Sequence, residues 1–176
     1  MEIKRIVVGQ LRTNCYLLID GGELVVVDPG DEAQKIISEI AKTGAAVKTI
    51  INTHNHFDHI GANDELEKKF KVPVRANLKD GETLTVGKSE LGVIRTSGHT
   101  PENVCLFGDG FVISGDTLFA DGFGRVDLPG GSEKEMGESL KKLDRLIPEA
   151  TMVYPGHGDI FKYRKGMALE WLDYFN

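Results

Sequence analysis

The five histidines of the sequence all stand in positions that suit metal ligands. Three of them, His54, His56 and His59, fall in one short stretch that reads Thr-His-Asn-His-Phe-Asp-His. The other two, His99 and His157, stand alone, each directly after a glycine and a short strand-like segment. Because no histidine is left over for a surface or a generic core position, this set favours a metal-dependent active site.

Two acids complete the set of candidate ligands. Asp58 lies inside the three-histidine stretch, and Asp116 follows the apolar run of residues 111–115. Asp58 has an alternative as a turn former, and a lone histidine such as His157 is usually a loop or core residue. The cluster and the lone histidines occur together, however, which favours ligation. A set rich in imidazole with two carboxylates suits Zn, Fe or Mn rather than Mg or Ca.

The order of these residues predicts two neighbouring metals. His54 and His56 are two apart, so they project the same way from an extended loop and can share one metal. Asp58 and His59 follow a turn and can face a second metal. The remaining candidates arrive from elsewhere in the chain and can complete or bridge the two sites: His99, His157 and Asp116.

Paired metals indicate hydrolysis. Two divalent ions about 3.5–4 Å apart suit a shared hydroxide, and coordination lowers the pKa of bound water towards about 7. The same ions polarise a carbonyl and stabilise the oxyanion that forms on it. We therefore expect metal-assisted hydrolysis of an activated acyl or phosphoryl bond, with Asp116 bridging the metals and Asp58 orienting the nucleophile.

Two further residues each have two interpretations. Asp28 ends a strand before Pro29-Gly30, where it is either a turn residue or orients the metal-binding loop by hydrogen bonds. Arg125 lies in the glycine-rich loop of residues 116–131. It is either a solvated surface arginine or a bidentate clamp for a substrate carboxylate.

The elements that must position these residues follow from periodicity. Apolar, β-branched runs predict strands over residues 3–8, 15–19, 24–27, 47–51, 72–76, 83–86, 91–96, 103–107, 111–114 and 152–154. Helical spacing predicts helices over residues 32–42, 62–70, 133–147 and 162–175. Every candidate ligand then lies at or beyond a strand end, and the repeated order of elements indicates two packed sheets with helices outside.

The composition is that of an ordinary globular protein. A chain of 176 residues with 40% apolar and 27% charged residues suits one domain over residues 1–176. The net charge is −6 and no lysine–arginine run is present, which disfavours a nucleic-acid partner.

No signal peptide or membrane segment is recognisable, so a cytoplasmic location without a membrane partner is expected. Cys15 and Cys105 are expected to be buried free thiols, with a disulfide as the alternative.

The stretch over residues 53–61 resembles the signature of the metallo-β-lactamase superfamily and matches its HxHxDH motif in full. Shorter motifs resemble the others of that family in the right order: Asp28-Pro29-Gly30, Gly98-His99-Thr100, Gly115-Asp116-Thr117 and Gly156-His157-Gly158. The resemblance implies an α+β fold, a four-layer αββα sandwich of two mixed sheets. It also implies zinc, iron or manganese, with zinc preferred, in two sites bridged by Asp116: His54, His56 and His99 in the first, and Asp58, His59 and His157 in the second.

Within the superfamily, residues 115–119 and 122–131 resemble the glyoxalase II group, and more closely its short hydroxyacylglutathione hydrolase-like proteins. Those enzymes hydrolyse thioesters such as S-lactoylglutathione, so a small-molecule thioester is the expected substrate. Full-length glyoxalase II proteins add a C-terminal helical domain that helps to bind glutathione. The sequence runs about one helix beyond His157, so that domain is not expected, and thioester hydrolysis is better supported than glutathione as the thiol.

The nearest alternative is an oxidoreductase, a persulfide dioxygenase, a group that shares the fold and a Gly-x-Gly-Arg-x-Asp pattern like residues 122–127. It holds one iron at positions matching His54, Asp116 and either His99 or His56. A metallo-nuclease or phosphodiesterase is disfavoured by the short acidic chain, and a β-lactamase by the loop after Asp116. A non-catalytic metal-binding protein is disfavoured because every ligand position is kept.

Overall fold

A computed structural model describes residues 1–175, which form two compact units. The first unit comprises Met1–Asn77 and Thr83–Leu91. The second unit comprises Leu78–Glu82 and the chain from Gly92 onward. Each unit is therefore assembled from two segments of the sequence.

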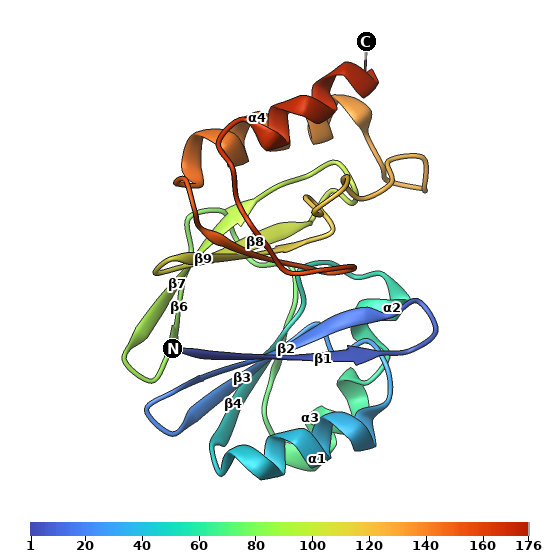
Figure 1. The fold of residues 1–176 in the computed structure, drawn as a ribbon. Helices are drawn as coiled ribbons and strands as arrows, with labels where there is room; N and C mark the ends of the chain where they lie inside the picture. Colours follow the sequence, from blue (N-terminus) through green and yellow to red (C-terminus); the bar gives the residue numbers. More distant parts are fainter. Residues whose placement is uncertain (176) are drawn as a thin grey trace. The chain divides into compact units, whose positions relative to one another are not determined.

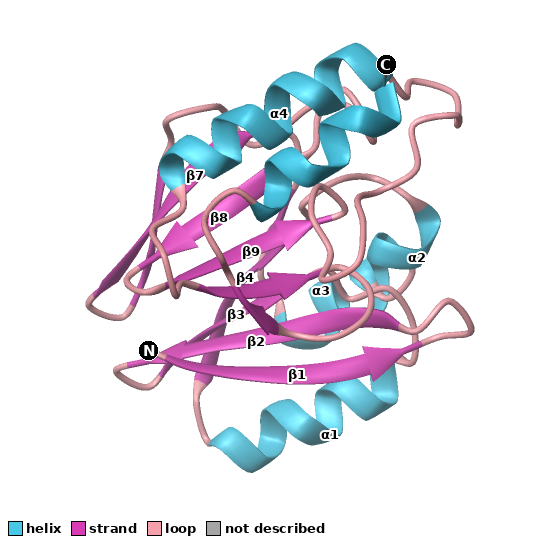
Figure 2. Ribbon diagram, turned by 45° about the horizontal axis from the view of Figure 1, so that its top comes forward, coloured by secondary structure: helices cyan, strands magenta, loops and turns pink. Residues whose placement is uncertain are grey.

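The first unit is built on a five-stranded mixed sheet with the strand order β1-β2-β3-β4-β5 (Figure 1). Its strands are β1 (Glu2–Val8), β2 (Thr13–Asp20), β3 (Glu23–Val27), β4 (Ala46–Ile51) and β5 (Val74–Arg75). Strands β1 to β3 pair antiparallel, whereas β3, β4 and β5 pair parallel. Helices α1 (Ala33–Thr43) and α3 (Asn63–Phe70) cover one face, and α2 (Phe57–Ile60) is a single turn (Figure 2).

The core of the first unit follows the periods of its elements. Cys15 and Leu17 of β2 lie two residues apart and so face the same side of the sheet. Ile36 and Ile40 of α1 lie one helical turn apart and pack with Leu66 of α3 into the same cluster. The helices thereby hold the strands whose ends carry the candidate ligands.

Strands of the second unit belong to a six-stranded mixed sheet with the order β11-β10-β9-β8-β7-β6. Its members are β6 (Thr83–Val86), β7 (Ser89–Arg95), β8 (Val104–Gly108), β9 (Phe111–Gly115), β10 (Met152–Pro155) and β11 (Phe161–Lys162). Helix α4 (Glu133–Leu146) and the 3-10 helix η1 (Met167–Phe175) pack beside each other over it (Figures 1 and 2). Met136, Leu140 and Leu143 of α4 form a core with Val112 and Val153 of the sheet.

The predicted strands and helices are present with shifted ends, except near the C-terminus. The helix predicted over residues 162–175 is wrong over its first part, because Phe161–Lys162 pair with β10 as β11. Gly166 has φ +89°, a left-handed conformation that interrupts a helix, and η1 starts one residue later as a 3-10 helix. The strand predicted over residues 72–76 shortens to Val74–Arg75, since Pro73 lacks the N–H that a longer ladder needs.

Both cysteines are buried free thiols, as expected from the sequence. Desolvation raises the pKa of Cys105 to about 11 and raises the pKa of Cys15 well above its usual value. Each thiol therefore stays protonated at neutral pH and packs as a small apolar group. Across residues 1–175, no helix combines the length and apolar character that crossing a bilayer requires.

Candidate metal centre

Parallel strand pairing in the first unit places Asp28 beside the three-histidine stretch. Strands β3 and β4 are parallel, with Val27 opposite Ile51, so their carboxyl ends reach the same edge of the sheet. Asp28 follows β3 directly, and its backbone N–H donates to the carbonyl of Ile51 at 2.9 Å. The histidine stretch starts just beyond the end of β4. The topology alone thus brings this carboxylate to that loop.

Asp28 is 1% exposed, and residues of the histidine stretch contact both of its carboxylate oxygens. Its Oδ1 accepts the backbone N–H of Thr53 at 2.7 Å, and its Oδ2 accepts the Thr53 hydroxyl at 2.7 Å. The Nδ1 of His59 lies 3.1 Å from the same Oδ2. A carboxylate at this distance favours the tautomer with the proton on Nδ1, which leaves the lone pair on the Nε2 of His59.

The ring of His54 is oriented by the same network. The Thr53 hydroxyl lies 3.1 Å from the Nδ1 of His54 and already donates its proton to Asp28. It must therefore accept from His54, which leaves the Nε2 of that ring as a lone-pair donor. The ring centroid of His54 lies 4.8 Å from that of His56 and 4.1 Å from that of His59. Three imidazoles are thus gathered at one place.

Asp58 lies on the single turn of α2, a short helix that the sequence did not predict. Its Oδ2 accepts the hydroxyl of Thr13 at 2.9 Å and lies 3.6 Å from the Nε2 of His59. The turn sits so close to the chain after β3 that a Cβ on Gly30 would lie 1.6 Å from the carbonyl oxygen of Asp58. Only glycine fits there, so Gly30 permits the approach that places Asp58.

The second unit repeats the arrangement with a second parallel pair. Strands β9 and β10 are parallel, with Gly115 opposite Pro155, and Gly156 donates to the carbonyl of Gly115 at 2.8 Å. Asp116 and His157 follow these two strand ends and therefore share one edge. His99 lies in the loop after β7, which ends at that edge because β7, β8 and β9 pair antiparallel in turn.

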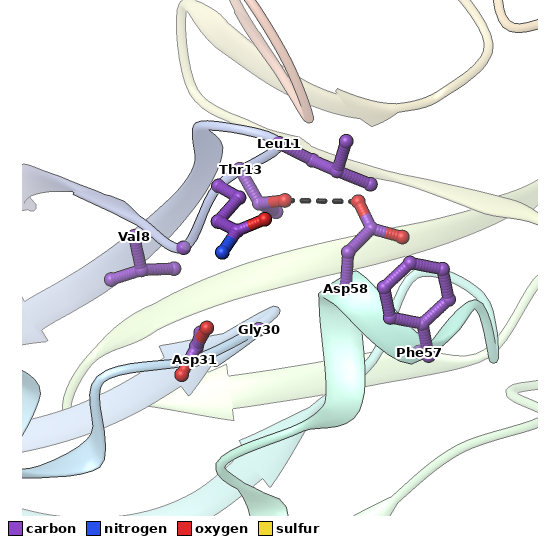
Figure 3. A pocket seen from close by; sticks show the side chains of 9 residues that line it. Val8, Leu11, Thr13, Gly30, Asp31, Phe57 and Asp58 are labelled. Carbon is purple, nitrogen blue, oxygen red and sulfur yellow. Dashed lines mark hydrogen bonds between the residues drawn. The ribbon is translucent and has the colours of Figure 1, made fainter.

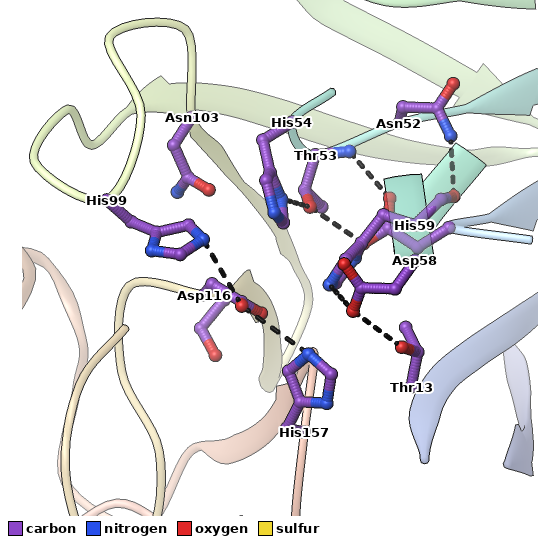
Figure 4. Close-up of polar contacts among 12 residues, drawn as sticks. Thr13, Asn52, Thr53, His54, Asp58, His59, His99, Asn103, Asp116 and His157 are labelled. Carbon is purple, nitrogen blue, oxygen red and sulfur yellow. Dashed lines mark hydrogen bonds and ion pairs between the residues drawn. The ribbon is translucent and has the colours of Figure 1, made fainter. Parts of the chain in front are cut away.

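One oxygen of Asp116 faces two histidines. Its Oδ2 lies 3.5 Å from the Nε2 of His99 and 3.5 Å from the Nε2 of His157, on either side of the carboxylate (Figure 4). Two ligand atoms that share a tetrahedral zinc, each about 2.1 Å from the metal, stand about 3.4 Å apart. Both separations match shared coordination better than a hydrogen bond. This spacing suits a carboxylate that bridges two ions.

The glycine-rich loop fixes the orientation of His99. The Nδ1 of His99 lies 2.7 Å from the main-chain carbonyl of Arg125 and so donates its proton there. Gly124 donates its N–H to the carbonyl of Asp116 at 3.0 Å, and a Cβ at Gly124 would lie 2.0 Å from that oxygen. The loop therefore needs glycine at this position to reach both Asp116 and His99.

Sequence patterns did not single out a buried polar network that joins these two loops. Thr96 and Thr117 pair through their hydroxyls at 2.8 Å, and the Nδ2 of Asn103 donates to the hydroxyl of Thr117 at 2.7 Å. All three side chains are 0% exposed. Single polar residues at strand ends are common, so only their proximity in the fold reveals that they tie the His99 loop to the Asp116 loop.

The guanidinium of Arg125 is exposed and already paired. Its Nε and Nη2 donate to the two carboxylate oxygens of Asp127 at 2.8 Å and 2.7 Å. These hydrogen bonds lower the pKa of Asp127 to about 2, so the pair is fully charged at neutral pH. The structure thus shows Arg125 in a bidentate interaction with a carboxylate of its own chain.

The residues present fit a transition metal. In each unit a carboxylate oxygen lies 3.5–3.6 Å from an imidazole Nε2, and the Nδ1 atoms of His54, His59 and His99 each lie within 3.1 Å of an oxygen of the same unit. Such outer hydrogen bonds orient metal-binding histidines and raise their basicity. The first unit supplies His54, His56, Asp58 and His59; the second supplies His99, Asp116 and His157.

The family model of the metallo-β-lactamase superfamily matches residues 8–86 and 77–157. The chain belongs to this superfamily. The probable metallo-hydrolase YqgX of Bacillus subtilis is 34% identical over 192 residues, with 90% of each chain covered. The superfamily prediction is confirmed, and a metal-dependent hydrolase is supported by this relative.

Solved structures confirm the predicted fold class. The B3 metallo-β-lactamase BLEG-1 matches with a TM-score of 0.87 and 28% identity over 98% of this chain and 97% of that one. The di-iron form of TTHA1623 matches with a TM-score of 0.84 and 31% identity over 90% and 94%. ETHE1 from Myxococcus xanthus has a TM-score of 0.87 at 22% identity over 100% and 92%, a likeness of fold alone.

Proposed function

We propose that this metallo-hydrolase is a thioesterase of the glyoxalase II type, which cleaves S-hydroxyacyl thiols such as S-lactoylglutathione. The loop of residues 115–131, which resembles that group, supports this specificity, and the two sets of ligands support the chemistry. The substrate would be a small molecule, without a nucleic-acid or membrane partner. Two free buried thiols are in keeping with a reducing, cytoplasmic location.

The proposed metal centre uses all seven candidate ligands. His54, His56 and His99 would hold one metal, and Asp58, His59 and His157 would hold the other, as in the resemblance stated above. Asp116 would bridge them, and the observation that carries this step is the equal 3.5 Å spacing of its Oδ2 from two Nε2 atoms. Zinc is the preferred metal, with iron and manganese as the other candidates.

When bound, such a metal pair lowers the pKa of water and polarises the thioester carbonyl. The chain's own residues would orient the metal-binding rings and the attacking water. Asp28 and the carbonyl of Arg125 hold the Nδ1 protons of His59 and His99, so each ring keeps one orientation through the reaction. Asp58, whose Oδ2 accepts a hydrogen bond from the hydroxyl of Thr13, would accept a hydrogen bond from the attacking water and orient it towards the carbonyl carbon.

The leaving group favours a thioester over an amide. The Nδ1 protons of His54, His59 and His99 are committed to acceptors of the chain, and the carboxylates would bind metal. These groups are therefore poor general acids. A thiolate departs without protonation, whereas an amine requires it. A thioester is thus the acyl substrate that this arrangement serves best.

Hydrolysis of S-D-lactoylglutathione by protein loaded separately with zinc, iron and manganese tests the proposal. We expect kcat/KM of about 10⁴ M⁻¹s⁻¹ or more with at least one metal, in the usual range of enzymes on their own substrates. Metal-free protein is the control. Failure with this and other thioesters, together with oxygen uptake on glutathione persulfide or turnover of a β-lactam, would overturn it in favour of those activities.

Arg125 is proposed to clamp a substrate carboxylate, and Asp127 then competes for the same guanidinium. With S-D-lactoylglutathione, Arg125→Met should raise KM roughly 10-fold with little change in kcat, because a charge-assisted bidentate pair is lost. Asp127→Asn should lower KM, because the competitor is weakened. A neutral N-acetylcysteamine thioester should respond to neither. Equal effects of both variants on both substrates would show that the pair only shapes the loop.

A further inference from the structure

A cavity of about 260 Å³ opens beside Asp58 in the first unit. Its walls come from the β1–β2 turn, from the chain after β3 and from the start of α2 (Figure 3). Thr13 and Asp58 meet at this cavity, so it adjoins a residue that the proposed function places on a metal. Thioester hydrolysis at the proposed metal centre assigns the cavity no role.

Two large apolar side chains line this opening. Leu11 on the β1–β2 turn is 55% exposed, and Phe57 at the start of α2 is 75% exposed. Figure 3 shows both side chains near the carboxylate of Asp58. Apolar side chains exposed together beside polar groups are the lining that a ligand-binding site needs.

The walls are held in place by hydrogen bonds within the chain. The hydroxyl of Thr13 donates to Asp58 at 2.9 Å, which ties the start of β2 to α2. Gly9 donates its N–H to the carboxylate of Glu32 at 3.0 Å, which fixes the turn that carries Leu11. A preformed cavity binds with little ordering cost, so the site is ready for its occupant.

Charge decides which part of a thioester fits. The charged side chains that line the cavity are those of Asp31 and Asp58, and none of its described lining residues is basic. The proposed metal would neutralise Asp58, which leaves the exposed carboxylate of Asp31 as the charge at the cavity wall. The abundant thiol carriers, glutathione and coenzyme A, are anionic, and this carboxylate would repel them. The acyl side of the substrate is the part that can be neutral and apolar.

We propose that this cavity binds the acyl chain of the substrate, with Leu11 and Phe57 as the residues that set chain-length preference. This inference rests on the proposed thioester hydrolysis and names its substrate class: unbranched, uncharged acyl groups of about four to six carbons, longer than lactoyl. An apolar cavity of about 150 Å³ holds benzene, so 260 Å³ leaves room for such a chain.

The kinetic test uses acetyl, butyryl and hexanoyl thioesters of N-acetylcysteamine, a neutral thiol. For the zinc-loaded protein kcat/KM should rise roughly 2–3-fold for each added methylene, since burying one is worth a factor of about 4 at most. Leu11→Ser and Phe57→Ser should reduce this increase in kcat/KM, and the largest decrease should be for the hexanoyl thioester. Leu11→Met should keep the increase. Leu146→Ser, which alters a leucine on α4 of similar exposure, 44%, is the matched control.

A binding test separates this inference from the proposed function. The probes are the corresponding S-alkyl thioethers of N-acetylcysteamine, which cannot be hydrolysed, and their Kd is measured by calorimetry. We expect the Kd to fall as the alkyl chain lengthens, and we expect this trend to be lost in Leu11→Ser and kept in Leu146→Ser. That result supports the acyl site even if no thioester is hydrolysed. A Kd independent of chain length in the unmodified protein overturns the inference, whatever the hydrolysis assay gives.

Discussion

Asp116→Asn is expected to remove bound metal and to lower thioester hydrolysis more than about 100-fold, since losing even an outer partner of a ligand costs about 10–100-fold. The carboxylate Oδ2 stands 3.5 Å from two histidine Nε2 atoms, so the substitution affects both proposed sites at once. An amide keeps the shape of the side chain and removes its charge. Metal content by mass spectrometry and kcat/KM are the measurements.

Thermal unfolding separates loss of metal from loss of fold. Asp116 is 6% exposed, and a buried carboxylate costs desolvation when no cation faces it. Metal-free Asp116→Asn should therefore unfold at or above the temperature of the metal-free parent. Its rise in Tm on adding zinc should disappear, because that rise measures binding to the folded state. A variant that keeps the full zinc-dependent rise would contradict the bridging role.

Two further variants test whether the expected loss of metal is specific to Asp116. Asp58→Ala should reduce the metal content from two ions to one, because Asp58 contributes to one site only. Asp109→Asn removes an exposed acid from the β8–β9 turn and should change neither metal content nor rate. A parent protein that holds one ion, and loses none with Asp58→Ala, would favour the single-iron dioxygenase over the hydrolase.

The sequence placed every candidate ligand at or beyond a strand end, and the fold shows which of these strand ends lie at the same edge of a sheet. Strands with apolar runs are easy to locate, and parallel neighbours such as β3 and β4 must end at the same edge. Asp28 and the histidine stretch therefore had to meet. Likewise Asp116 and His157 follow the parallel strands β9 and β10. The sequence located these strand ends but did not predict their parallel pairing, which the fold defines.

The partners that orient the rings could not be predicted in this way. Thr53 bridges Asp28 and His54 through one hydroxyl, and its role depends on hydrogen-bond directions that only the fold defines. The contact from His99 to the carbonyl of Arg125 leaves no mark in the sequence, because every residue has a carbonyl. The predicted C-terminal helix is present over Met167–Phe175 as a 3-10 helix, and it begins late because Phe161–Lys162 pair with β10.

Asp28→Asn is expected to weaken metal binding in the first unit about 10–100-fold and to destabilise the fold by about 2–4 kcal/mol. The carboxylate is 1% exposed, accepts hydrogen bonds from the Thr53 N–H and the Thr53 hydroxyl, and lies 3.1 Å from the His59 Nδ1. An amide has one accepting oxygen, so at least one buried donor loses its acceptor. The His59 and His54 rings then lose their fixed tautomers.

The backbone at Asp28 makes asparagine the right replacement and alanine the wrong one. Its φ is +51°, in the left-handed region that asparagine tolerates and alanine resists at a cost of about 1–2 kcal/mol. Asp20→Asn is the matched control, because Asp20 also ends a strand and accepts the Lys88 N–H at 2.7 Å and the Ser89 hydroxyl at 3.1 Å. That control should lose some stability and keep its metal affinity. If Asp28→Asn behaves in the same way, with lower Tm but unchanged zinc Kd, Asp28 serves the turn alone and does not orient the metal-binding histidines.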